Sequence, residues 1–313
     1  MKFAIIYHVY KNTTSLRESL HSIFSQVDRN FELILINDFS SIAVTNIINE
    51  FNFNELKQFT YLKYSQNLGH SYSFNNALNI TTSDYVLYAG SNFIFNKNFT
   101  KIVNETIDKT SDVDVISFTN IKNDCSVQIF NKLNANMKLL LRQSMKDKIV
   151  SVKMLREHKI MLDENLYSPL VYIYQILSAF KKWVIVDFKQ AEYLKNNKFT
   201  YNLYDIFEQN DYLISEYSQT KFWRSNIDLI QYFMTLYIIL IFIPRIFLSY
   251  SDRQIRLKAI ESARSWLSKN IPNWKNNKIF KKNKVMSKQM SEDLVGMKFK
   301  IKYITKLMKE YKI

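Results

Sequence analysis

The chain has 313 residues, 47% of them hydrophobic and 15% aromatic, so it can bury a sizeable core and lacks the composition of a disordered protein. Its formal net charge of +15 favours a partner rich in phosphate, such as an anionic lipid surface or a nucleic acid. Its one cysteine, Cys125, excludes an intramolecular disulfide and argues against a cysteine-based zinc site, which suits a reducing compartment.

The first part of the chain alternates between strand patterns and helical patterns. The opening run KFAIIYHV is typical of a strand covered on both faces, and it is too short an apolar core for a secretory signal, so we expect none. The next segment has apolar residues at helical spacing, with Ser15 and Glu18 in a capping-box pattern at its start. The predicted strands are 2–9, 31–37, 60–64, 84–89 and 113–118, and the predicted helices are 15–26, 43–51, 71–80 and 98–108.

This strand and helix alternation predicts the fold class and the location of the site. It favours an α/β fold with a doubly wound, mostly parallel sheet. Such sheets bind ligands beyond the carboxyl ends of their strands. We therefore expect the functional residues in the loops that follow those ends. These loops are 8–12, 38–41, 67–70 and 90–92.

Past residue 118 the pattern loosens. Segment 149–166 predicts a helix and a loop, and segment 171–188 predicts a helix and a strand. Segment 229–244 then has 16 residues and no charge, about 24 Å as a helix, whereas a bilayer core needs about 20 residues. Three interpretations stay open for it: a helix lying at a membrane interface or docked on the protein, a short transmembrane or re-entrant segment, and a soluble core helix.

Positive charge gathers at the C-terminal end. From 251 to 313 there are 17 Lys or Arg and five Asp or Glu, a balance of +12, so the first 250 residues carry only +3. Segment 252–269 predicts an amphipathic helix with Ile255 on its apolar side, and 291–313 fits a helix or a strand. An apolar run beside clustered basic residues is typical of a segment on an anionic leaflet. We expect a location at the cytoplasmic side of the cell membrane, peripheral or shallowly inserted. The alternative role for this tail is nucleic-acid binding, but the sequence contains no nucleic-acid-binding motif.

Four blocks in order carry a resemblance to a known family. They are IIYHVYKNTTSLRESLHSIFSQ, NFELILINDFSS, NLGHSYSFNNALNITTSDYVLYAGSN and KIVSVKMLREHKIMLDENLYSPLVYIYQIL. In this order and spacing the chain resembles family 2 glycosyltransferases with the GT-A fold, over about residues 2–205. The resemblance implies a GT-A-like domain, and the change of composition from residue 211 sets its boundary: 1–210 for the domain and 211–313 for a helical, membrane-facing extension. It also implies transfer of a sugar from a nucleotide sugar, with a UDP-sugar expected, to a lipid or surface-glycan acceptor.

The resemblance places the family's metal motif on residues without carboxylates. The Asp-x-Asp pair, which holds Mg²⁺ or Mn²⁺ against the leaving diphosphate, falls on Gly90, Ser91 and Asn92. Asn92 keeps a carbonyl oxygen but no charge, and Gly90 has no side chain. The resemblance therefore implies a degenerate metal site and gives no confident cofactor.

The expected catalytic base is also missing. The family's Glu-Asp pair, which takes the proton of the acceptor hydroxyl, falls on Ser168 and Pro169. Neither residue can act as a base at neutral pH. Asp163 and Glu164, a few residues upstream, are the weaker alternative candidates.

Part of the nucleotide-side pattern is kept. Val9 and Tyr10 match the turn that lies along the base, and Asp38 matches an acid that would accept a hydrogen bond from uracil. Gly69 matches a glycine that lets the ligand approach closely, and Asn75 matches the asparagine of the following helix. The alternative for Asp38 is a turn or helix-capping acid, which is equally consistent with its position.

Lys11 and His70 lie in the ligand-side loops and are candidates for contact with the diphosphate, because cationic side chains can offset its charge without metal. The alternative for His70 is an exposed turn histidine. Two functions follow from these patterns. The first is a membrane-associated glycosyltransferase with a degenerate site. The second is an inactive homologue that acts as a membrane scaffold or as the partner of an active transferase.

Overall fold

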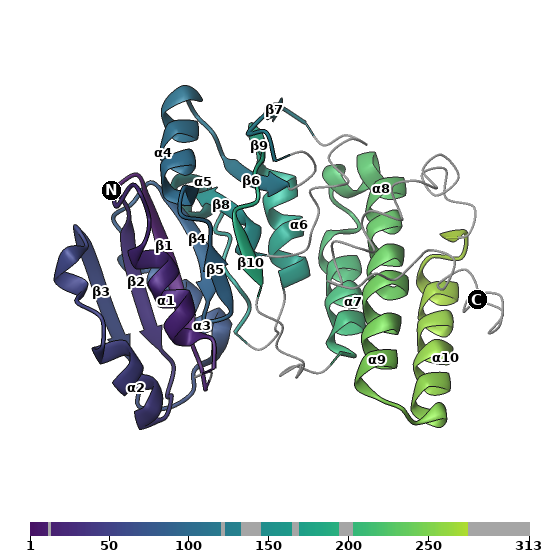
Figure 1. The fold of residues 1–313 in the computed structure, drawn as a ribbon. Helices are drawn as coiled ribbons and strands as arrows, with labels where there is room; N and C mark the ends of the chain where they lie inside the picture. The colour runs from purple at the N-terminus through teal and green to yellow at the C-terminus, as the bar shows by residue number, and fades with distance from the viewer. Residues whose placement is uncertain (12–13, 120–122, 133–144, 165–168, 194–202, 275–313) are drawn as a thin grey trace. The chain divides into compact units, whose positions relative to one another are not determined.

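The computed structural model describes residues 1–11, 14–119, 123–132, 145–164, 169–193 and 203–274. The chain forms two compact units, Met1–Asn197 and Lys198–Ile313, and each is described by itself (Figure 1). Composition places the division between residues 210 and 211, whereas the compact units divide between residues 197 and 198.

The first unit is built on an eight-stranded sheet. Its strands, in spatial order, are β3 (Gln58–Lys63), β2 (Glu32–Asn37), β1 (Phe3–Val9), β4 (Tyr85–Gly90), β8 (Lys148–Ser151), β6 (Val115–Thr119), β9 (Trp183–Asp187) and β7 (Val127–Phe130). Neighbours from β3 to β4 are parallel, as are β6 and β9, while β8 runs antiparallel to both β4 and β6. The prediction of a mostly parallel α/β sheet is confirmed.

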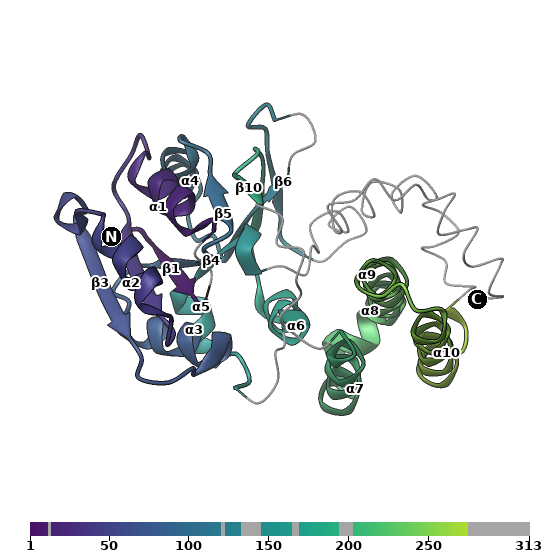
Figure 2. The same ribbon diagram turned by 60° about the horizontal axis from the view of Figure 1, so that its bottom comes forward.

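Helices cover both faces of this sheet (Figure 2). The helices of one face are α1 (Leu16–Phe24), α2 (Ile42–Asn49) and α4 (Phe99–Lys109), and those of the other are α3 (Gly69–Ile80), α5 (Val152–Glu157) and α6 (Pro169–Ala179). Both faces of β1 are therefore buried, which explains its run of apolar residues. The odd-numbered residues of β1 join the core shared with α1, α2 and α4. Because side chains alternate along a strand, His8 lies on the opposite face, toward α3.

The sequence patterns do not predict several short strands. β5 (Phe93–Phe95) and β10 (Ala191–Tyr193) pair antiparallel in a small second sheet. The helix predicted within 149–166 begins only at Val152, because the residues before it form β8. Strands of three or four residues are too short to show periodicity, and their pairing depends on the rest of the fold.

The predicted capping box at α1 is not formed. Ser15 is the N-cap, but its side chain makes no capping hydrogen bond. Its hydroxyl donates instead to the carbonyl oxygen of Ser91, at 2.6 Å. This contact ties the start of α1 to the loop after β4, so the serine stabilises the edge of the sheet where a ligand is expected.

The second unit is helical where it is described. Its elements are α7 (Asp205–Tyr217), α8 (Lys221–Tyr237), the π-helical segment η4 (Ile238–Phe242), α9 (Ile243–Ser249) and α10 (Arg253–Asn270). The π-helical turn comes directly before Pro244, whose ring has no N–H to donate to the preceding turn. The predicted amphipathic helix 252–269 is confirmed as α10, although Ile255 on its expected apolar side is 39% exposed. Segment 291–313 lies outside the described residues.

The uncharged run 229–244 lies in α8, η4 and the start of α9. Phe242, in this run, packs against Tyr204 and Phe207, and Phe207 also contacts Trp266 of α10. The Trp266 indole N–H donates to Asp211 of α7, at 2.7 Å. Among the helices described, none combines the length and the apolar character needed to cross a bilayer.

Candidate functional site

The carboxyl ends of the central strands bring the predicted ligand-side loops to one edge of the sheet. β1, β2 and β4 are parallel neighbours and end at Val9, Asn37 and Gly90. The Asp38 N–H donates to the Val9 carbonyl oxygen at 3.0 Å, so the first two loops begin in contact. Parallel pairing thus assembles residues that are far apart in the sequence.

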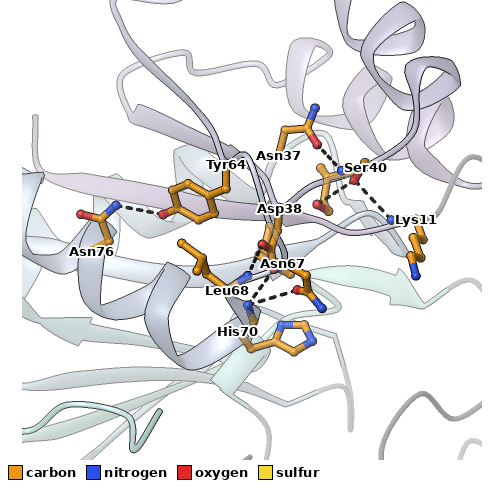
Figure 3. Close-up of polar contacts among 12 residues, drawn as sticks. Lys11, Asn37, Asp38, Ser40, Tyr64, Asn67, Leu68, His70 and Asn76 are labelled. Atoms are coloured by element: carbon orange, nitrogen blue, oxygen red, sulfur yellow. Dashed lines mark hydrogen bonds and ion pairs between the residues drawn. The ribbon is translucent and has the colours of Figure 1, made fainter. Parts of the chain in front are cut away.

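Asp38 organises this edge. It is completely buried, and its two oxygens accept the backbone N–H groups of Leu68 at 2.8 Å and Gly69 at 2.9 Å. The second oxygen also lies 3.1 Å from Nε2 of His8. Figure 3 shows the carboxylate of Asp38 beside Leu68 and Asn67. The turn before α3 is therefore held against the ends of β1 and β2.

These contacts also set the ionisation of Asp38. Burial raises the pKa of its carboxyl, but hydrogen bonds from His8, Leu68 and Gly69 outweigh burial and hold the pKa below its ordinary value. Asp38 is thus an ionised acid that shapes a turn. The N-cap of α2 is Ser41, so Asp38 does not cap that helix. A direct contact of Asp38 with a nucleotide base stays a prediction.

Gly69 stands at the first residue of α3 with a φ of +81°. This left-handed conformation strains any residue with a side chain. A Cβ built at Gly69 meets no described atom within 4 Å, so the space above it is open. The backbone at this turn therefore leaves room for a closely approaching ligand, while the predicted contact of Gly69 with a nucleotide stays a prediction.

Two histidines and a tyrosine are in contact at this edge of the sheet. The ring centroids of His8 and His70 are 4.4 Å apart, and His70 Nδ1 lies 2.6 Å from the hydroxyl oxygen of Tyr88 in β4. Burial, and then electrostatic interaction with His8 and Lys146, lower the pKa of His70 to about 3. His70 is therefore neutral at neutral pH, and it would contact a diphosphate through a hydrogen bond and not as a cation.

The loop after β1 is shaped mainly by its backbone. Val9 is buried, and its carbonyl oxygen also accepts the Ser40 hydroxyl at 3.2 Å. Lys11 is exposed with a φ of 53°, and its N–H donates to Ser40 Oγ at 3.3 Å. Its Nζ lies 4.8 Å from the ring centroid of Tyr10. The contacts predicted for both residues with the nucleotide sugar stay predictions. Figure 3 shows Lys11 beside Ser40.

Asn75 links α3 to the segment that precedes α6. Its amide group donates to the Leu162 carbonyl oxygen at 2.8 Å and accepts the Leu162 N–H at 2.9 Å. The same amide nitrogen donates to Oε1 of Glu164 at 3.2 Å. Asn75 thus positions one of the two alternative base candidates, while the neighbouring Asp163 is half-buried. Its predicted contact with a nucleotide stays a prediction.

The sequence reasoning missed Lys146. This residue lies in the short 3-10 helix η3 (Met145–Asp147), directly before β8. Its Nζ donates to Oδ1 of Asn92 at 3.4 Å and lies 3.6 Å from a Cβ built at Gly90. Burial lowers the pKa of this ammonium group to about 8. No local motif signals the residue, because β8 carries it to the site only through sheet pairing.

The comparisons identify this region. Residues 4–159 match the description Glycosyl transferase family 2. Residues 4–159 form a family 2 glycosyltransferase domain. A comparison with curated proteins gave no match.

Solved structures support the GT-A fold of this glycosyltransferase domain. S. aureus TarS 1–349 in complex with UDP-GlcNAc aligns with a TM-score of 0.67 and 15% identity, over 89% of this chain and 88% of that one. The mannosyltransferase PcManGT from Pyrobaculum calidifontis, in complex with GDP-Man and Mn²⁺, aligns with a TM-score of 0.52 and 10% identity, over 91% and 84%. The chain spans 55% of a longer TarS structure. At these identities the likeness shows the fold.

The family's divalent cation does not fit the residues present in this domain. The positions expected to hold it are Gly90 and Asn92, and the Lys146 ammonium group occupies the space beside them. Within the described ranges, no group of three or more His, Cys, Asp or Glu could hold a metal ion. A neutral amide and a nearby positive charge are poor surroundings for Mg²⁺ or Mn²⁺, which prefer oxygen ligands with negative charge.

The expected base positions are only partly described. Pro169 begins α6, and Ser168 lies outside the described residues. Asp163 and Glu164, upstream of this gap, stay candidates for the base.

Proposed function

We propose that this protein is a glycosyltransferase that transfers a hexosyl group from a nucleotide sugar to a glycan or lipid acceptor at a membrane. The observation that carries the proposal is the turn held by Asp38. It leaves open space above Gly69, at the carboxyl edge of a family 2 glycosyltransferase domain. A nucleotide diphosphate fits this edge, because ligands of doubly wound sheets bind where the strand order reverses.

A UDP-sugar is the donor that we expect. The structurally similar TarS protein was crystallised with UDP-GlcNAc and with UDP, which supports this choice of base. Asp38, Tyr10 and the Gly69 turn form the expected nucleotide side. The acceptor side is expected where Asn75 holds the segment 162–164.

The membrane part of the proposal rests on charge. The balance of +12 over residues 251–313 would draw the protein to an anionic leaflet. We propose a peripheral position at the cytoplasmic side of the cell membrane, with the second unit nearest to the lipid.

The test is calorimetric titration of the full chain with UDP, UDP-sugars and, as a comparison, GDP and GDP-mannose. Each titration is run with EDTA and with Mn²⁺. Binding of a nucleotide sugar, followed by release of UDP when acceptors are supplied, is the expected result. Absence of binding for every nucleotide and both conditions would overturn the proposal.

The loss of carboxylates favours a second candidate, an inactive homologue that supports an active transferase at the membrane. Gly90, Asn92 and Pro169 stand where the family's acids are expected. In that case turnover requires the combined substitutions Gly90→Asp, Asn92→Asp and Pro169→Asp. Turnover by the unmodified chain would exclude this candidate.

A further inference from the structure

The topology of the sheet brings Lys146 to the position where the family's metal ion is expected. β8 runs antiparallel to β4, with Tyr85 opposite Ser151 and Leu87 opposite Ile149. The start of β8 therefore lies beside the carboxyl end of β4, where Gly90 and Asn92 are found. Lys146 comes just before β8, so its side chain is delivered to the loop that follows β4.

The segment around Lys146 is anchored. The Gln190 side-chain amide donates to the Lys146 carbonyl oxygen at 3.3 Å. The next two residues, Asp147 and Lys148, form a buried ion pair at 2.6 Å. Breaking a buried pair of this kind is costly, so the 3-10 helix is held in place. Asp147 directs its carboxylate to Lys148, beside the backbone that carries Lys146.

The two replaced positions suit a lysine better than a metal. An aspartate at position 92 would form an ion pair with the ammonium group and offset its charge. Asn92 instead offers a neutral carbonyl oxygen at 3.4 Å, which contacts the ammonium group without adding a negative charge. A Cβ atom at position 90 would lie 3.6 Å from the ammonium nitrogen, and Gly90 has no such atom. The loss of the carboxylates at positions 90 and 92 is thus compatible with the presence of the lysine beside them.

The charge of Lys146 acts on the rest of the edge. It contributes to the lowered pKa of His70, which lies in the turn held by Asp38. Its field therefore extends over the region where the nucleotide is expected. Although burial lowers its pKa to about 8, the ammonium form still prevails at neutral pH. A phosphate group bound beside it would favour that form further.

We propose that Lys146 takes the place of the family's divalent cation by binding the diphosphate of the nucleotide sugar, so that the reaction needs no metal. This inference rests on the proposed function. In the transfer step, the bond between the anomeric carbon and the diphosphate oxygen breaks, and its electron pair stays on the diphosphate. The acceptor hydroxyl oxygen bonds to the anomeric carbon, and its proton passes to a carboxylate or to water. The ammonium group stabilises the negative charge that the diphosphate gains.

The test compares UDP with UMP, because the two differ by the phosphate that Lys146 is expected to contact. The full chain is titrated in EDTA and physiological salt, as wild type and as Lys146→Met. The wild type binds UDP more tightly than UMP. Lys146→Met loses about 30-fold in UDP affinity, the range of a charge-assisted contact, and keeps its UMP affinity. Unchanged UMP affinity also shows that the variant is folded.

Two further variants sharpen this comparison. Lys146→Arg keeps the charge and retains most of the preference for UDP. Lys153→Met removes an exposed lysine of α5, whose side chain is 82% exposed, and leaves both affinities unchanged. If Lys146→Met does not fold, Lys146→Gln takes its place, because a polar group remains beside Asn92.

The outcomes separate this inference from the proposed function. If the wild type binds UDP only when Mn²⁺ is added, or if Lys146→Met binds UDP as the wild type does, the role of Lys146 is refuted and the glycosyltransferase proposal stands. Equal affinity of the wild type for UDP and UMP in EDTA would also refute the role of Lys146 and leave the glycosyltransferase proposal standing. If neither the uridine nor the guanosine nucleotides bind, the nucleotide site itself is absent and both proposals fall.

Discussion

Individual residues of this site have partners that a sequence motif does not show. Asp38 occupies the position of a family acid, yet its oxygens are hydrogen-bonded to the turn before α3. His70 was expected in a ligand-side loop but lies in the first turn of α3, where burial keeps it neutral. The residue types could be predicted from the sequence, whereas their ionisation follows from neighbours on other strands.

We expect Asp38→Asn to destabilise the fold by about 2 kcal/mol, because an amide cannot accept both N–H groups and loses the charge that strengthens them. The pKa of Asp38 is lowered by folding, so its contribution is complete above the ordinary pKa of about 4 and is lost as the pH falls through the lowered value. Denaturant unfolding at pH 7 and pH 3 measures this difference. The control is Asp108→Asn, an exposed surface partner of Lys2, which should cost less than about 1 kcal/mol.

His70→Asn should reveal a dependence of stability on pH in the same direction, but over a higher pH range. Folding lowers the pKa of His70 to about 3, so below about pH 6.5 the unfolded chain takes up a proton that the folded protein does not. The wild type should therefore lose stability relative to His70→Asn as the pH falls from 7 to 5, by up to about 1.4 kcal/mol per pH unit. Thermal unfolding across this range checks the trend. His158→Asn, which replaces an exposed histidine, is the control, and an equal trend there would contradict the prediction.

Elements of the first unit follow the sequence patterns where they are long, and depart from them where they are short. Alternating strands and helices from β1 to β6 were predictable because periodicity persists over several turns or residues. The short strand β8 was not, and neither was the contact of Ser15 with Ser91 that replaces the capping box. Both depend on neighbours supplied by distant parts of the chain.

Asn75→Ala should loosen the connection between α3 and the segment before α6. The substitution removes three hydrogen bonds and leaves the buried Leu162 backbone without its side-chain partner, which should cost about 2–3 kcal/mol. Chemical denaturation measures the loss, and hydrogen exchange should show faster exchange at the Leu162 amide. Asn79→Ala, at an exposed position of the same helix, is the matched control. Equal stability of the two variants would show that the link contributes little.

At the scale of the whole molecule, charge and fold are distributed unequally. The family 2 glycosyltransferase domain lies in the first unit, whereas most of the net positive charge lies beyond residue 250. The composition reveals this asymmetry, but it does not decide whether lipid or nucleic acid is the partner. A basic surface attracts any phosphate-bearing partner.

We expect the full chain to float with vesicles that contain anionic lipid and to be released as salt rises from 50 to 500 mM, over which the Debye length shortens about threefold. Deletion of residues 275–313, which hold 12 of the lysines, should weaken this binding strongly, because each basic residue near the surface contributes about 1 kcal/mol. Neutral vesicles are the control. A stronger shift with RNA at matched salt would favour nucleic acid instead.

The sequence by itself determined the α/β class, the edge of the sheet where a ligand is expected, the resemblance to family 2 glycosyltransferases and the missing acids at Gly90 and Asn92. These features depend on local periodicity and on short motifs, which the order of residues records directly. Only the tertiary structure brought Lys146 to Asn92, 54 positions away, and Asn75 to Leu162, 87 positions away. Contacts over such separations are set by strand pairing and helix packing, for which neither segment carries a local pattern.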